Sequence, residues 1–122
     1  MNTWKVLLVD DEKEFVTALA ERLNLRGIAA SIATNGKEAL ALIGADRPDV
    51  VVLDVLMPGL GGLAVLDQIR TTDPKIKVIL LTGRGAIHED DERVPPGAFD
   101  YLIKPVNIDD LIEKMREALD AP

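Results

Sequence analysis

Carboxylates follow two apolar runs that lie far apart in the sequence. Asp10, Asp11 and Glu12 come directly after WKVLLV, and Asp54 comes directly after VVVL. Carboxylates that are brought together repel one another and raise one another's pKa values. A divalent cation relieves this repulsion, and all-oxygen ligation suits Mg²⁺ better than zinc. Because Mg²⁺ commonly shares a phosphate oxygen, these acids indicate phosphoryl chemistry if the fold brings them together.

A hydroxyl and an ammonium follow two further apolar runs. Thr82 follows KVILL, and Lys104 follows FDYLI. The hydroxyl of Thr82 is a donor, and Lys104 carries a mobile point charge suited to phosphate oxygens. With the acids, this set matches phosphoryl transfer, where positioning and charge neutralisation supply most of the catalysis. Asp54 is a chemically reasonable nucleophile, because aspartyl phosphate is a known type of intermediate.

The elements that must position these residues follow from apolar patterns. Apolar runs predict five strands, at residues 4–9, 28–33, 50–53, 77–81 and 99–103. Helical spacing predicts helices at residues 13–25, after Asn35, at residues 62–70 and after Asn107. Asn35 and Asn107 are expected helix caps, and Gly27 is an expected helix stop.

Alternation of strand and helix predicts an α/β fold with a parallel sheet between two helical layers. The expected architecture is a flavodoxin-like, doubly wound (βα)5 three-layer sandwich with strand order 2-1-3-4-5. In that order the first and third strands are neighbours, and ligands bind beyond their carboxyl ends. Asp10, Asp11 and Asp54 should therefore converge there, and Thr82 and Lys104 should lie on the same rim.

The segment GRGAIHEDDERVPPGA, between the fourth and fifth expected strands, fits this pattern poorly. Ile87 and Val94 are its only large apolar residues, and Pro95-Pro96 prevents a helix from continuing. We therefore expect a short, exposed or irregular fourth helix, with residues 87–97 as its unusual part.

Composition sets further bounds. The 122 residues suit one domain, residues 1–122, which could also be the N-terminal part of a longer protein. Without cysteine there is neither a disulfide nor a Cys-ligated zinc site. A net charge of −7 argues against direct nucleic-acid binding by this chain. No apolar run approaches the roughly 18 residues of a membrane span, so we expect a soluble, cytoplasmic chain.

Four motifs together, VLLVDDE, VVLDVLMPGLGGL, VILLTG and DYLIKP, resemble the receiver domain of two-component response regulators (CheY-like) and cover almost the whole chain. The resemblance implies that Asp54 is the phosphoacceptor. It also implies that Asp10, Asp11, Asp54 and the backbone carbonyl of Leu56 hold Mg²⁺. The phosphoryl donor would be a phosphohistidine on a sensor histidine kinase or a phosphotransfer protein.

The resemblance further implies that Thr82 contacts the phosphoryl group, that Tyr101 is a switch aromatic coupled to Thr82, and that Lys104 pairs with the phosphoryl group. The Lys104-Pro105 bond is usually cis in the family. Phosphorylation would alter the surface of the fourth helix, fifth strand and last helix, which controls an output domain or partner and could form a homodimer. Such a domain is not a conventional enzyme, since it catalyses only its own phosphorylation and dephosphorylation.

The sequence departs from the family pattern in places. Gly61-Gly62 stands where the family often has Asp-Gly, and HEDDERVPP lies on the expected output surface. Leu56 and Arg84 lie two residues past Asp54 and Thr82, where family side chains tune dephosphorylation. We hypothesise that apolar Leu56 cannot orient an attacking water, so that the phosphoryl group persists.

Simpler interpretations stay open for the single residues. The acids at residues 10–12 could merely begin a helix, and Asp54 could form an Asx-turn before Pro58-Gly59. As a whole, the chain could be a Mg²⁺-dependent phosphohydrolase, although Leu56 stands where such an enzyme needs a general acid. It could also be a binding module that acts without phosphorylation, although the complete set of acids, hydroxyl and lysine argues against that.

Overall fold

The computed structural model describes residues 4–83 and 94–122. Its strands are β1 (Lys5–Val9), β2 (Ala29–Ala33), β3 (Val50–Asp54), β4 (Lys77–Thr82) and β5 (Asp100–Ile103). Its helices are α1 (Lys13–Leu25), α2 (Gly36–Ala45), α3 (Gly62–Thr72) and α4 (Ile108–Asp120). The five predicted strands, and the four helices predicted outside the segment between the fourth and fifth strands, are confirmed in order and to within a few residues at their ends.

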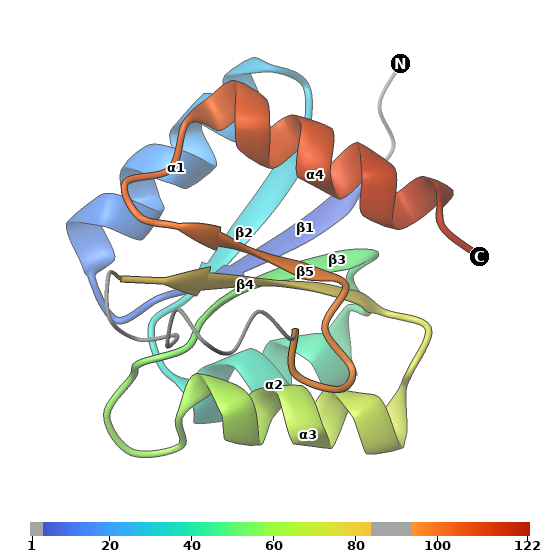
Figure 1. Cartoon of the computed structure of the whole chain (residues 1–122). Coiled ribbons are helices and arrows are strands. Elements are labelled where there is room, and N and C mark those ends of the chain that lie inside the picture. The colour runs from blue at the N-terminus through green and yellow to red at the C-terminus, as the bar shows by residue number, and fades with distance from the viewer. Residues whose placement is uncertain (1–3, 84–93) are drawn as a thin grey trace.

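The five strands form one parallel sheet in the order β2-β1-β3-β4-β5. Helices α1 and α4 cover one face of the sheet, and α2 and α3 cover the other (Figure 1). The predicted flavodoxin-like sandwich is thus confirmed. The irregular fourth helix expected before β5 falls mainly on residues 84–93, which lie outside the described residues. The label α4 therefore belongs to the last predicted helix.

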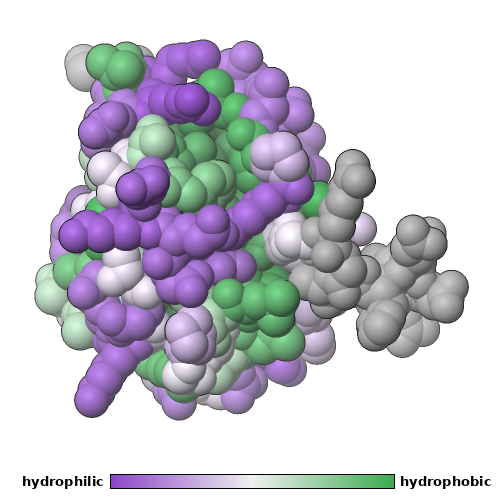
Figure 2. Space-filling view, turned by 90° about the vertical axis from the view of Figure 1, so that its left-hand side faces the viewer, coloured by the Kyte–Doolittle hydropathy of each residue, from purple (hydrophilic) through white to green (hydrophobic). Residues whose placement is uncertain are grey.

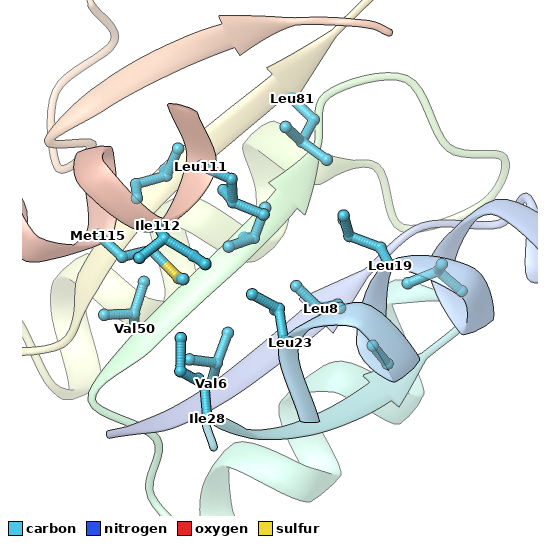
Figure 3. Close-up of a cluster of buried hydrophobic side chains, with 14 of the residues drawn as sticks. Val6, Leu8, Leu19, Leu23, Ile28, Val50, Leu81, Leu111, Ile112 and Met115 are labelled. Atoms are coloured by element: carbon cyan, nitrogen blue, oxygen red, sulfur yellow. The ribbon is translucent and has the colours of Figure 1, made fainter. Parts of the chain in front are cut away.

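Alternate residues of the central strands enter two separate cores. Val6, Leu8 and Val50 pack with α1 and α4, as the cluster in Figure 3 shows. Leu7 and Val9 pack on the opposite face with α2 and α3. All five residues of β3 are buried, so its sequence of consecutive apolar residues reflects burial on both faces. These two cores hold the end of β3, and hence Asp54, in a fixed position.

The helix ends follow the expected local chemistry. The side chain of Asn35 accepts a hydrogen bond from Glu38 N, and that of Asn107 accepts from Asp109 N and Asp110 N. Gly27 has a positive φ of 79° just after α1, a conformation that glycine adopts without a steric penalty. The predicted caps and stop are confirmed.

The strand register aligns the polar residues that follow the strands. Val9 pairs with Leu53, so the next residues, Asp10 and Asp54, lie side by side. On the other side of β3, Thr82 pairs with Ile103, which immediately precedes Lys104. The backbone N–H of Lys104 donates to the carbonyl of Thr82 at 2.8 Å. Register alone therefore brings the predicted site residues to one edge.

Gly62 lets the start of α3 pack directly on the end of β3. A Cβ atom at this position would lie 2.0 Å from the carbonyl oxygen of Asp54, a distance that no side chain tolerates. The N–H of Gly62 also donates to the carbonyl of Val55. Position 62 therefore requires glycine, because α3 starts in close contact with the backbone of Asp54.

We predict that Gly62→Ala destabilises the protein by more than about 1 kcal/mol, because the backbone at Asp54 or the start of α3 must shift. Gly44→Ala is the matched control: Gly44 also lies in a helix, but its added Cβ would contact nothing within 4 Å. Helix propensity should make that variant more stable by up to about 1 kcal/mol. Urea unfolding measures both, and equal effects of the two substitutions would contradict the packing argument.

Candidate functional site

Three carboxylates meet at the carboxyl ends of β1 and β3. Asp10 and Asp54 are buried, and Asp11 is exposed. One carboxylate oxygen of each residue lies within 4.8 Å of the others. The predicted convergence of Asp10, Asp11 and Asp54 is therefore observed, and it arises because the two strands are neighbours in the sheet.

Each buried acid uses one oxygen in a local turn. Asp10 Oδ1 accepts from Glu12 N at 2.9 Å, and Asp54 Oδ1 accepts from Leu56 N at 3.2 Å. These bonds to the residue two positions later are Asx-turns, so the simple interpretation of Asp54 is correct for one oxygen. Oδ2 of each residue instead faces the ammonium of Lys104. Each acid can therefore form its Asx-turn through Oδ1 and still face Lys104 through Oδ2.

The electrostatic state of Asp54 reflects its surroundings. Burial is the main cause that raises its pKa from 3.8 to about 6, and the charge of Asp10 raises it further. The charge of Lys104 and the hydrogen bond from Leu56 N oppose this shift. Repulsion between carboxylates was expected from the sequence, but burial proves to be the larger cause. Asp54 nevertheless remains mainly ionised at neutral pH.

Among the described residues, Lys104 supplies the cation that faces these acids. Its Nζ lies 2.7 Å from Asp10 Oδ2, 3.0 Å from Glu12 Oε1 and 3.7 Å from Asp54 Oδ2. Burial lowers the pKa of Lys104, but hydrogen bonds and charges from Asp10, Glu12 and Asp54 outweigh burial, and the pKa is raised. The ammonium therefore stays charged and balances part of the negative charge.

Two residues at the start of α1, neither of which was predicted to have this role, also contact Lys104. They are Glu12, through its carboxylate, and Phe15, whose ring centroid lies 4.8 Å from Lys104 Nζ. The available signal was their spacing of three residues, which places both on one side of a helix start. Their partner could not be deduced, because Lys104 is 92 residues from Glu12.

The other predicted site residues lie around this cluster. Thr82 is buried at the end of β4, and its hydroxyl donates to the carbonyl of Gly83 at 3.1 Å. The Leu56 side chain is exposed, at 66% of its full area. Tyr101 is partly buried against the core on the α2 and α3 side. The Lys104-Pro105 bond is cis, as the resemblance implied.

The residues at this edge fit a magnesium ion. The three acids provide hard carboxylate oxygens, the type of ligand that Mg²⁺ prefers. Apart from the Lys104 ion pair, the buried Oδ2 of Asp10 has no hydrogen-bond partner among the described residues. A bound Mg²⁺ would neutralise negative charge and coordinate a phosphoryl oxygen. Asp10, Asp11 and Asp54 are the residues that would hold it.

The surface around the site is mixed in character. Figure 2 shows the side of the molecule toward which β4 and β5 point in Figure 1. On this side, hydrophilic residues extend across the centre of the view, with apolar areas above and below them. Exposed Leu56 and Leu60 belong to the loop that follows β3. Among the acids at the carboxyl ends of β1 and β3, Asp11 and Glu12 are exposed, whereas Asp10 and Asp54 are buried.

The comparisons with known proteins agree with this geometry. The sequence model of the response regulator receiver domain matches residues 6–116, and the chain belongs to that family. Receiver domains of response regulators are signalling switches that generally interact with histidine kinases and bind Mg²⁺ at an acidic pocket. No described helix is long and apolar enough to cross a membrane.

Individual relatives have moderate identity. The chain is 41% identical to the response regulator MprA of Mycolicibacterium vanbaalenii over 115 residues, which is 94% of this chain and 50% of that protein. The value for MprA of Mycobacterium avium is 39%, with the same coverage. The chain therefore spans about half the length of the curated relatives it matches.

Solved structures show the same fold. A response regulator receiver domain protein from Clostridium thermocellum superposes with a TM-score of 0.87 at 32% identity, covering 96% of this chain and 94% of that one. The response regulator protein TrrA from Thermotoga maritima, in complex with Mg²⁺ and BeF, gives 0.81 at 35% identity, covering 96% and 100%.

We predict that Asp54→Asn stabilises the metal-free protein at neutral pH. Because the folded-state pKa of about 6 exceeds 3.8, the folded chain binds more protons between these values. The contribution of Asp54 to stability is full below about pH 4 and is lost as the pH rises through 6. The variant lacks this loss, so at pH 7 it should be more stable by on the order of 1–2 kcal/mol, which is the full linkage value reduced for solvent screening.

Urea unfolding in a chelating buffer between pH 4 and pH 7 measures this difference. Asp67→Asn is the control, because Asp67 is an exposed carboxylate on α3. Its pH dependence should match that of the wild type. A less stable Asp54→Asn variant at pH 7 would show that Asp54 is not held under electrostatic stress.

Proposed function

We propose that this chain is a phosphorylation-dependent signalling switch in which Asp54 accepts a phosphoryl group from a phosphohistidine of a sensor histidine kinase or a phosphotransfer protein. The observation that carries the proposal is the position of Asp54 at the end of β3, with Asp10 and Asp11 within 4.8 Å and Lys104 at 3.7 Å. Carboxylate, metal ligands and ammonium are the parts that phosphoryl transfer needs.

In the proposed reaction, a carboxylate oxygen of Asp54 attacks phosphorus while the bond from phosphorus to the donor nitrogen breaks. The imidazole leaves with the electron pair of that bond. Asp10, Asp11, Asp54 and the Leu56 carbonyl would hold Mg²⁺, and Lys104 and the Thr82 hydroxyl would contact the phosphoryl oxygens. The acyl phosphate is later hydrolysed by water, so the chain catalyses only its own phosphorylation and dephosphorylation.

The proposed output runs through the edge of the sheet that carries Thr82 and Lys104. Phosphorylation adds about −1.5 to −2 units of charge near Thr82. Thr82 pairs with Ile103 on β5, and Tyr101 lies two residues before Ile103 on the same strand. We propose that a shift of Thr82 and Tyr101 alters the surface formed by β5, α4 and the segment before β5. This surface would control an output domain or partner, or form a homodimer.

The described part of this surface carries specific contacts. Lys114 on α4 pairs with Asp100 on β5 at 2.8 Å, next to Tyr101. Ile103 is half exposed on the same strand.

The net charge of −7 supports an output that does not involve direct nucleic-acid binding by this chain. We further propose that phosphoryl transfer to this chain takes place in the cytoplasm.

Intact mass after incubation with acetyl phosphate and Mg²⁺ tests the proposal. We expect one phosphoryl adduct in the wild type, none in Asp54→Asn and one in the control Asp67→Asn. No adduct in the wild type would favour the phosphorylation-independent binding module. Turnover of unrelated phosphate esters would favour the phosphohydrolase instead.

A second prediction concerns the lifetime of the acyl phosphate. The exposed, apolar Leu56 side chain offers no hydrogen bond to an attacking water. Leu56→Asn supplies one, so it should accelerate phosphoryl loss by roughly two- to tenfold, the value of one net hydrogen bond. Leu63→Asn, at another exposed leucine on α3, is the control and should leave the decay rate unchanged. An unchanged rate in Leu56→Asn would refute this role of Leu56.

A further inference from the structure

The resting position of Lys104 favours the acids of the first strand end over Asp54. Its Nζ makes close contacts of 2.7 Å with Asp10 and 3.0 Å with Glu12, whereas Asp54 Oδ2 is at 3.7 Å. A hydrogen bond from a nitrogen donor to an oxygen has a typical separation of about 2.7–3.2 Å, with charge-assisted bonds at the short end. Lys104 is therefore an ion-pair neighbour of Asp54 without a close hydrogen bond to it.

The Glu12 side chain contacts Lys104 instead of capping its own helix. Glu12 is the N-cap residue of α1, yet its side chain makes no capping hydrogen bond. Its carboxylate instead bonds Lys104, and its backbone N–H bonds Asp10 Oδ1. The ring of Phe15, one helical turn later, lies beneath the same ammonium at 4.8 Å. The start of α1 thus contacts Lys104 twice and Asp10 once.

We propose that Glu12, supported by the ring of Phe15, is a positioning residue that holds Lys104 in a resting position away from Asp54 and thereby slows phosphoryl acceptance. The inference rests on the proposed function of Asp54. The Lys104 ammonium has three N–H donors. Glu12 accepts a hydrogen bond from one of them, and Asp10 is an ion-pair partner at 2.7 Å. Asp10 also contacts Lys104, but Asp10 is a candidate metal ligand as well. Glu12 has no other proposed role, so a change at Glu12 tests the contact with Lys104 alone.

The chemical step explains the direction of the effect. With acetyl phosphate, a bond forms between an Asp54 carboxylate oxygen and phosphorus as the bond from phosphorus to the acetate oxygen breaks. Acetate leaves with that electron pair, and Lys104 transfers no proton. Negative charge on the phosphoryl oxygens must attract Lys104, which weakens its contact with Glu12. Loss of the Glu12 contact beforehand removes this competition.

The effect should be modest, because the Glu12 side chain is 65% exposed whereas that of Lys104 is 17% exposed. Ion pairs with an exposed member are weak, so we expect Glu12→Gln to raise the second-order rate constant for phosphorylation by acetyl phosphate roughly two- to fivefold. Phe15→Leu, which keeps apolar volume but removes the ring, should raise it by a smaller factor.

Two matched variants separate contact from general charge. Glu12→Asp keeps the charge but is one methylene too short to reach Lys104 at hydrogen-bond distance, so it should react as fast as Glu12→Gln. Glu14→Gln removes the same charge from the same helical turn, and Glu14 forms no ion pair with Lys104. It should react at the wild-type rate. A wild-type rate in Glu12→Asp, or an equal increase in Glu14→Gln, would overturn the inference.

An NMR measurement tests the resting contact without any reaction. In metal-free protein, the Lys104 Nζ resonance should shift and its protons should exchange faster in Glu12→Gln, but not in Glu14→Gln. An unchanged resonance would overturn the proposed contact. Failure of the wild type to be phosphorylated would overturn the proposed function and this role together. A reactive wild type with an unchanged rate in Glu12→Gln would overturn the role of Glu12 alone.

Discussion

The fold holds like charges together at one edge of a buried sheet. Asp10 and Asp54 are fixed side by side because Val9 pairs with Leu53 in adjacent parallel strands. Neither backbone can move away without disturbing cores on both faces of the sheet. Among the described residues, Lys104 supplies one ammonium facing the carboxylates of Asp10, Glu12 and Asp54, so it compensates only part of their charge. Packing therefore maintains an arrangement that electrostatics alone would separate.

This stress makes the edge sensitive to any change of charge. A cation bound by the acids, or a phosphoryl group on Asp54, alters the balance that sets the position of Lys104. Lys104 also belongs to the chain segment that leaves β5, and its backbone bonds Thr82. In the proposed switch, a change of charge at Asp54 is thus connected through short covalent and hydrogen-bonded paths to β5 and α4.

Most of the fold could be predicted from the sequence because its signals are local. Consecutive apolar residues mark strands buried on both faces, and Asn35 and Asn107 bond their own helix starts. The acids of the site could be placed because strand order determines which strand ends meet. The partners of Lys104 could not be predicted. Its long side chain has three N–H donors, and which carboxylates lie within their reach depends on the tertiary structure. Likewise, only the folded backbone shows why Gly62 tolerates no Cβ.

The different environments of the three acids support the proposed role of Asp54 as the nucleophile. Asp11 is exposed, and Asp10 is bound closely by Lys104 at 2.7 Å. Asp54 is buried but has a longer contact with the ammonium, so its pKa rises to about 6. A higher pKa makes a carboxylate more basic and more nucleophilic, while a value of about 6 still leaves it ionised at pH 7. In the proposed function, burial and an incompletely paired charge would together favour reaction at Asp54.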